Sequence, residues 1–411
     1  MSREGPLAGL LVLDLSRVLA GPFCTMLLAD MGARVVKVEH PAGGDVTRGW
    51  GPPWEPGSGL SAYYLAINRN KESIALDLST EAGAESVRIL ARRADVLVEN
   101  FVPGGLEKLG LSLEALRREN PRLVTAAITG FGRAGEEAAL PGFDLLAQAA
   151  AGLMAITGSE GATKVGVAVS DLFAGLFALA GIVALLRERE STGRGGHVEA
   201  DLFSSTLAAL INVAQTSLVT GVEAKRFGNA HPQIVPYRPF AASDGEFIVA
   251  AGTDRQFARL CGIVGRDSWA ADPWLRTNAG RVENREAIER GLEEIFRTDS
   301  RDRWIAACRE AGVPAGPVQG PLEALRSGLA GSLGAVVSAA GVPFVASPIR
   351  IEDRTAPIRF PPRLDEHGES LRREFGLPPN PVIPRSVSDE ESVVDKRQIP
   401  RSARDDIMRR K

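Results

Sequence analysis

A single carboxylate, Asp171, stands near the start of the most apolar segment of the chain, Gly166–Leu186. This segment, GVAVSDLFAGLFALAGIVALL, predicts a helix that is apolar on nearly every side, which is typical of a helix buried in a large core. Ser170 and Asp171 occupy the place of an N-cap, so the simplest interpretation is that Asp171 only caps this helix. Alternatively, a carboxylate at the positive end of a helix dipole stays ionised and can act as a nucleophile. The helix pattern alone leaves both interpretations open.

Length and composition indicate a soluble globular protein with two domains. The chain has 411 residues, of which 44% are hydrophobic and 24% charged. Its net charge of −3 gives no reason to expect nucleic acid or an anionic membrane as a partner. Cys24, Cys261 and Cys308 lie far apart and indicate neither a disulfide framework nor a metal site. The apolar run 172–186 is short for a membrane span and no signal peptide is evident, so we expect a cytoplasmic protein.

The first 200 residues alternate short apolar strands with helices, which predicts an α/β fold with a doubly wound parallel sheet. Ligands of such sheets collect where the strands end, here near Gly21, Asn100 and Gly130. The loop after the first strand, SRVLAGP, lacks the G-x-G-x-x-G pattern, so no nicotinamide cofactor is expected. Strands are expected at 10–15, 35–39, 73–78, 96–99, 123–128 and 197–201, and helices at 23–31, 82–93, 113–119, 143–154 and from 202 to about 218.

A second unit begins after a polar crossover at 223–236. We expect a strand pair around Asp244-Gly245, followed by helices at 256–264, 285–296 and 301–310. Residues 336–358 return to strand-like alternation. After Leu377 the chain is rich in Pro and charge, with too little apolar material to fold alone.

Several segments together resemble the class III CoA-transferases, the family of formyl-CoA and carnitine CoA-transferases. The matching sequences are LDLSRVLAGPF, GARVVKVEHPAGGDVTRGWGPP, NRNKESIALDL, VENFVPGGLEKLGL, TGFGRAG and GVAVSDLFAG. The resemblance implies a large Rossmann-like domain formed by both chain ends, 1–222 and 320–377, and a smaller α+β domain, 223–319. It implies an interlocked homodimer, and the remaining residues 378–411 are expected to form a disordered tail.

The resemblance also implies the roles of individual residues. The Asp of the segment VSDLFAG is the family's nucleophile, which assigns that role to Asp171. Coenzyme A is then a substrate in the form of acyl-CoA, and no permanently bound cofactor is expected. In the family's formyl-CoA transferases the positions of Leu19, His40 and Ser79 hold Gln, Arg and Lys, so those contacts must differ here. By position, the family's CoA contacts fall on Leu19, Ala20, His40, Leu76, Ser79, Asn100, Phe101, Lys108 and Asp144.

The expected reaction moves CoA from a dicarboxylyl-CoA, such as succinyl-CoA, to a free acid such as glutarate. Segments such as EAKRFGNAHPQIVPY resemble the family's succinate–hydroxymethylglutarate (glutarate) enzymes, and HPQIVPY replaces the glycine-rich loop of the formyl-CoA transferases, which argues against formyl or oxalyl specificity. A cation can bind the distal carboxylate, and the candidates are Arg17 and Arg48, followed by Arg226 and His231; Tyr237 is a further candidate for contacting the substrate.

Two alternatives remain. A racemase-like isomerase acting on α-methylacyl-CoA shares this fold, but it needs a catalytic His where this chain has Phe143. A non-catalytic CoA-binding protein is expected to have lost the nucleophilic Asp, which is present.

Overall fold

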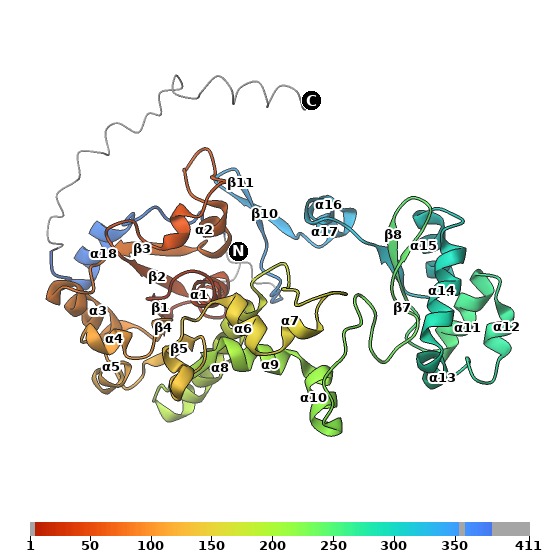
Figure 1. Ribbon diagram of the computed structural model, residues 1–411. Coiled ribbons are helices and arrows are strands. Elements are labelled where there is room, and N and C mark those ends of the chain that lie inside the picture. Colours follow the sequence, from red (N-terminus) through yellow and green to blue (C-terminus); the bar gives the residue numbers. More distant parts are fainter. Residues whose placement is uncertain (1–4, 353–357, 380–411) are drawn as a thin grey trace, which may run out of the picture.

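The computed structural model describes residues 5–352 and 358–379 and centres on a six-stranded sheet (Figure 1). Every neighbouring pair in this sheet is parallel, and the strand order is β3-β2-β1-β4-β5-β6. The order reverses between β1 and β4, which is where ligands bind in doubly wound sheets. The strands are β1 (Leu11–Asp14), β2 (Arg34–Glu39), β3 (Lys71–Ala75), β4 (Val96–Glu99), β5 (Val124–Thr129) and β6 (His197–Asp201).

Helices cover both faces of this sheet and form two separate cores with it. On one face α1 and α8 contribute Cys24, Leu28, Ala178 and Ile182 to a buried cluster that includes strand residues. On the other face α3 and α5 pack together with α18, a helix near the C-terminal end of the described chain. The helices of these two layers are α1 (Ala20–Asp30), α8 (Val169–Thr192), α6 (Asp144–Ala150), α9 (Leu202–Ala209), α3 (Glu81–Arg93), α5 (Leu113–Glu119) and α18 (Gly368–Phe375).

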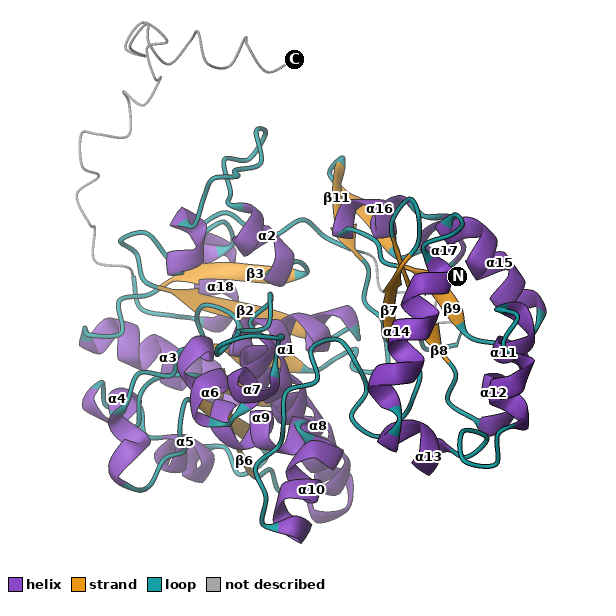
Figure 2. Ribbon diagram, turned by 45° about the vertical axis from the view of Figure 1, so that its right-hand side comes forward, coloured by secondary structure: helices purple, strands orange, loops and turns teal. Residues whose placement is uncertain are grey.

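A second, three-stranded antiparallel sheet has its own core and lies to one side of the first (Figures 1 and 2). Its hairpin turns at Asp244-Gly245, as predicted. The core of this unit draws its residues from 235–315, and a small fourth cluster joins Tyr64 to the β10-β11 hairpin. The elements are β7 (Tyr237–Ala241), β8 (Glu246–Ala250), β9 (Ala315–Pro317), α11 (Asp254–Ile263), α12 (Asp267–Ala271), α13 (Asn278–Glu283), α14 (Arg285–Phe296), α15 (Arg301–Glu310), α16 (Pro321–Arg326), α17 (Gly328–Ser332), β10 (Val336–Ala339) and β11 (Val342–Val345).

The proposed division into 1–222 with 320–377 and 223–319 stays a prediction, and these separate cores support it. The tail proposed at 378–411 falls outside the described residues, except for 378 and 379.

Most of the predicted elements are confirmed, and the differences have local causes. The helix expected at 143–154 is two, α6 and α7 (Leu153–Ile156), because Gly152 between them is left-handed with φ +82°. The helix expected from 202 to 218 is also two, α9 and α10 (Ile211–Thr220), with an 82° bend between them. The long loop 40–59 holds a short 3-10 helix, η1 (Val46–Gly49). Shorter elements complete the chain: α2 (Ala62–Ile67), α4 (Gly105–Lys108) and η2 (Glu136–Ala139).

The expectation that α8 is buried on all sides is wrong for this chain. One face of α8 lies in the core, but Leu176, Phe177 and Val183 form an exposed stripe at helical spacing on the other. By length and composition α8 is also long enough to cross a membrane, contrary to the expectation from its apolar run. Only 39% of its most apolar window is buried inside the protein, and the buried face, which includes Ala178 and Ile182, belongs to the core.

Candidate active site

Asp171 lies in the wall of two neighbouring cavities at the carboxyl ends of β1 and β4. The smaller cavity, of about 70 Å³, also touches Ala20 and Thr129. The larger, of about 330 Å³, is open to solvent and extends past Arg17, Val18 and Asp144. Asn100 and Phe101, the first residues after β4, line both. The carboxylate of Asp171 therefore lies at the point between β1 and β4 where the strand order reverses, which is where a doubly wound parallel sheet is expected to bind a ligand.

Asp171 is not the N-cap of α8, which contradicts the first of the two interpretations of this residue. The N-cap is Ala168, whose side chain cannot accept a hydrogen bond, and Asp171 lies in the first helical turn. One turn further on, Gly175 allows a close approach to α1: a Cβ there would lie 2.6 Å from the carbonyl oxygen of Ala20. Residues four apart share one face of a helix, so this contact also sets Asp171 beside the start of α1. The capping interpretation therefore fails on geometry.

The environment of Asp171 raises its pKa from 3.8 to about 7. Burial is the largest cause, because it penalises the ionised form, and the nearby charge of Asp144 acts in the same direction. A hydrogen bond from the backbone of Ala20, at the start of α1, acts against both. Burial and the charge of Asp144 therefore oppose the helix dipole, which by itself favours the ionised form of Asp171. Perturbed carboxylates of this kind concentrate at functional sites.

Two further side chains, Asp144 and Tyr63, interact electrostatically with Asp171. Asp144 accepts hydrogen bonds from the backbone N–H of Ser170, at 2.9 Å, and from the amide of Gln148, at 2.7 Å. Asp144 therefore anchors the first turn of α8 as well as lining the larger cavity. Tyr63 was not found by sequence reasoning, although it lies in the segment YYLAINRN. Its pKa is raised to about 12 by burial and by the charges of Asp171 and Asp144, so its phenol stays protonated at neutral pH.

The predicted CoA-binding residues follow four neighbouring strands of the sheet. His40 comes directly after β2, and Leu76 and Ser79 follow β3. Leu76 is buried in the core, which favours packing as its role, whereas His40, Ser79 and Lys108 are exposed. Lys108 ends α4, the short helix after β4. Because the carboxyl ends of parallel strands share one edge, the residues expected to contact CoA lie along the edge that carries Asp171; the contacts themselves stay a prediction.

Arg17 and Arg48 differ sharply in their surroundings. Arg17 is exposed in the wall of the larger cavity, with its guanidinium 5.0 Å from the ring centre of Phe101. Arg48 donates two hydrogen bonds to the carboxylate of Glu39, at 2.7 and 2.8 Å, and a third to the hydroxyl of Tyr64. Its side chain is only 10% exposed. Arg48 therefore has little capacity left for a substrate carboxylate, and Arg17 becomes the better candidate.

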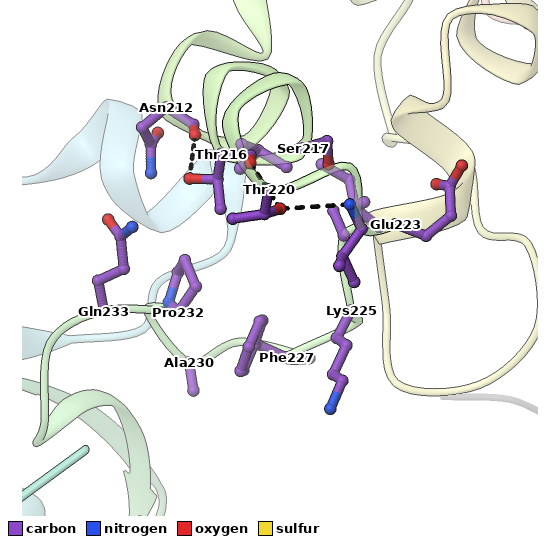
Figure 3. A pocket seen from close by; sticks show the side chains of 15 residues that line it. Asn212, Thr216, Ser217, Thr220, Glu223, Lys225, Phe227, Ala230, Pro232 and Gln233 are labelled. Atoms are coloured by element: carbon purple, nitrogen blue, oxygen red, sulfur yellow. Dashed lines mark hydrogen bonds between the residues drawn. The ribbon is translucent and has the colours of Figure 1, made fainter. Parts of the chain in front are cut away.

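His231 lies in the polar crossover and Tyr237 begins β7, and neither lines the two cavities that contain Asp171. Their rings face each other with centres 5.3 Å apart, and the backbone N–H of His231 donates to the carbonyl of Tyr237. A separate cavity of about 420 Å³ opens nearby, between α10 and residues 222–233 (Figure 3). Its lining includes Thr216, Ser217 and Phe227, and it does not contain Asp171.

Comparison with known proteins supports the same chemistry. The family described as CoA-transferase family III matches residues 7–368. The chain is 41% identical over 393 residues to the succinate–glutarate CoA-transferase of Agrobacterium fabrum, covering 91% of this chain and 96% of that one. It is 38% identical over 380 residues to the acetyl-CoA:oxalate CoA-transferase of Acetobacter aceti, covering 91% and 97%. A crystal structure of a CAIB/BAIF family protein from Brucella suis superimposes with a TM-score of 0.81 at 41% identity, over 91% of this chain and 100% of that one. The chain therefore belongs to CoA-transferase family III and is a CoA-transferase.

Proposed function

We propose that the protein moves CoA from a dicarboxylyl-CoA, such as succinyl-CoA, to a free carboxylic acid such as glutarate, with Asp171 as the covalent nucleophile. The observation that carries this proposal is the carboxylate of Asp171 in the wall of a cavity at the carboxyl ends of β1 and β4, with a pKa of about 7. A carboxylate that has lost part of its hydration attacks an acyl carbon more readily than a solvated one.

The proposed route has four acyl-transfer steps, in which a carboxylate displaces the CoA thiolate and the thiolate then displaces a carboxylate, in alternation. An Asp171 oxygen attacks the thioester carbon, the carbon–sulfur bond breaks, and CoA leaves as thiolate from a mixed anhydride. The thiolate then attacks the aspartyl carbon, which releases the first acid and leaves an aspartyl–CoA thioester. The acceptor carboxylate displaces the thiolate to form a second anhydride, and the thiolate takes the new acyl group and frees Asp171. No net proton is transferred, so the route needs no general base.

The surroundings of Asp171 suit these steps. The backbone N–H of Ala20, which lines the smaller cavity together with Asp171, is the proposed donor to the carbonyl oxygens on which charge develops. Leu19 is the N-cap of α1 and its side chain makes no capping hydrogen bond. The first backbone amides of α1 are therefore not occupied by a capping side chain. Partial burial also limits access of water, which hydrolyses anhydrides.

The racemase-like alternative finds no support in the geometry. It requires a histidine and an aspartate on opposite sides of the substrate's α-carbon. The chain has four histidines, all within the described residues, and none lines a cavity that contains Asp171. Phe143 lies in the wall of the larger cavity and is 66% exposed.

The choice of a dicarboxylate is supported by the relative named for succinate and glutarate, at 41% identity. The relative named for acetyl-CoA and oxalate, at 38% identity, makes acetyl-CoA and oxalate a second candidate pair and weakens the argument from the HPQIVPY segment against oxalyl specificity. Arg17 favours acyl groups that have a second carboxylate, such as succinyl or glutaryl, over acetyl, because its exposed guanidinium in the cavity wall can pair with that carboxylate.

We expect the wild-type protein to use succinyl-CoA and glutaryl-CoA with a higher kcat/KM than butyryl-CoA, which has the chain length of succinyl-CoA but lacks the distal charge. Arg17→Ala is expected to lower kcat/KM for the two dicarboxylyl substrates by about tenfold, because a charge-assisted hydrogen-bonded pair contributes about 1.5–3 kcal/mol. The measurement is initial velocity with each acyl-CoA and a panel of free acids, with products identified by mass.

Arg118→Ala is the matched control, since Arg118 is an exposed arginine on α5, far along the chain from the site, and should leave all the values unchanged. Equal efficiency for butyryl-CoA and glutaryl-CoA in the wild type contradicts the dicarboxylate assignment. Preference for acetyl-CoA with oxalate selects the second candidate pair, and no transfer with any pair refutes the proposed function.

The exposed stripe of α8 supports a further part of the proposal, a homodimer. Leu176, Phe177 and Val183 are uncovered in a single chain, as are Leu218 and Val219 of α10. Apolar patches of this kind mark interaction surfaces. A second copy of this chain is the proposed cover, and sedimentation that finds only monomers at micromolar concentration contradicts it.

A further inference from the structure

The turn that joins β1 to α1 contains a residue in an unfavourable backbone conformation. Val18 has φ +68°, in the left-handed region, where a β-branched side chain is a genuine outlier. Val18 also lines the larger cavity together with Asp171. Strained backbone persists only where its surroundings over-determine it, and it concentrates at functional sites. The contacts that hold this turn therefore bear on the reaction.

Side chains from distant parts of the chain hold the backbone of this turn. The carbonyl of Ser16 accepts a hydrogen bond from Lys37 Nζ at 2.8 Å. The side-chain amide of Asn100 binds both the N–H and the carbonyl of Arg17, at 2.8 and 2.7 Å. The N–H of Val18 donates to the carboxylate of Asp45, at 3.2 and 3.4 Å to its two oxygens. Asp45 is the side chain that binds the strained residue itself.

Asp45 is fixed in turn by a buried ion pair. Its carboxylate lies 3.0 Å from the ammonium group of Lys37, and both side chains are fully buried. The charge of Lys37 lowers the pKa of Asp45 despite burial, and the charges of Asp14 and Asp45 raise the pKa of Lys37, so both groups stay ionised. Asp45 also accepts from the backbone and hydroxyl of Thr47. Such a carboxylate has no other position to adopt, so the Val18 N–H is held in one place.

The conformation of Val18 sets the position of the first amide of α1. Ala20 follows Val18 by two residues and lines the smaller cavity together with Asp171. The turn is tight, since a Cβ on Gly21 would lie 2.2 Å from the Cβ of Ser16. A change of φ at Val18 therefore shifts the Ala20 amide, while the start of α8 is held independently by the hydrogen bond from Ser170 to Asp144.

We propose that Asp45, paired with Lys37, is a positioning residue for CoA transfer: it holds Val18 in its left-handed conformation and so keeps the Ala20 amide against Asp171. This inference rests on the proposed function of Asp171. Asp45 does not contact the reacting atoms and acts through the backbone of residues 18–20.

The test is a double-mutant cycle between residues 45 and 18. Asp45→Asn should lower kcat by about tenfold or more with KM for acyl-CoA changed less than about threefold, because a small displacement of a catalytic donor has effects of this size. Val18→Gly should restore much of the loss, at least about fivefold, since glycine adopts positive φ without a steric penalty and no longer needs the carboxylate. The matched control is Asp45→Asn with Val46→Gly, which removes a neighbouring exposed valine and should restore nothing.

A second measurement, of thermal unfolding, does not depend on enzyme activity. It therefore tests the conformation of Val18 even if the proposed function is wrong. At a position with ordinary backbone angles, a protein with glycine is less stable than one with alanine. At a position with positive φ, the protein with glycine is the more stable one. Val18→Gly should therefore unfold at a higher temperature than Val18→Ala. If Asp45→Asn does not fold, the cycle uses Lys37→Met with Asp45→Asn, which leaves no unpaired buried charge. The proposal is overturned if Val18→Gly restores no activity, if Val46→Gly restores as much, or if Val18→Ala is the more stable variant.

Discussion

Asp171→Ala abolishes CoA transfer: we expect kcat to fall by about four orders of magnitude or more, the scale seen when a covalent nucleophile is removed. The route depends on an anhydride to this one side chain, and the two cavities that contain it offer no histidine or cysteine as a substitute. Asp171→Asn keeps the size of the side chain but cannot form the anhydride, so it should be equally inactive.

The fold should survive these substitutions. The side chain of Asp171 does not cap α8, and the helix start is anchored instead by the bond from Ser170 to Asp144. Far-ultraviolet circular dichroism and thermal unfolding provide the control. A well-folded Asp171→Ala protein that transfers CoA at near the wild-type rate contradicts the mechanism.

The second large effect is on pH dependence. Only the ionised carboxylate attacks, and its pKa in the free protein is about 7. We therefore expect kcat/KM to fall about tenfold for each pH unit below 7 and to level off above it. Asp144→Asn removes one cause of the raised pKa and should move this profile toward acid, whereas Asp302→Asn, on the surface of α15, should not. A profile that is flat between pH 5 and 8 contradicts the raised pKa.

The raised pKa of Asp171 also makes the stability of the fold depend on pH. An ion-paired carboxylate stabilises the fold more as pH rises, whereas Asp171 stabilises it less. Because the folded pKa lies above the unfolded value of 3.8, the folded protein binds more protons than the unfolded chain between about pH 4 and 7. The contribution of Asp171 to the free energy of unfolding is therefore fully present below about pH 4 and is lost as pH rises through about 7. The loss is at most about 4 kcal/mol, since each pKa unit corresponds to about 1.4 kcal/mol. Asp171→Asn should thus unfold at a higher temperature than wild type at pH 8 and at a similar temperature at pH 4.

Several helices and strands could be predicted with their bounds because the sequence signals for them are local. The strand at 96–99 and the helices at 113–119, 285–296 and 301–310 have the expected bounds, since each is a short apolar run or an amphipathic stretch with clear ends. The start of α1 was placed three residues late because its N-cap, Leu19, gives no capping signal, and because Pro22 lies inside the first turn, where proline is tolerated.

The candidate site was predictable only in part. Asp171 is recognised through a motif, and its position at the strand ends follows from the parallel topology. The roles of Arg48 and Asn100 depend on partners distant in sequence: Glu39 and Tyr64 for the first, and the backbone of Arg17 for the second. Lys37 lies in the middle of a strand, where its sequence gives no sign that it is fully buried against Asp45. Pairings of this kind become visible only when the strands and loops are brought together.

The most direct test of covalent CoA transfer through Asp171 is to trap the intermediate. Wild-type protein is incubated with succinyl-CoA, treated during turnover with hydroxylamine or borohydride, digested and mapped by mass spectrometry, with Asp171→Ala as the control. The account predicts a hydroxamate or reduced side chain on the peptide that contains Asp171, absent from the variant and from protein without acyl-CoA. Modification found only elsewhere, for instance on the buried Cys24, contradicts it.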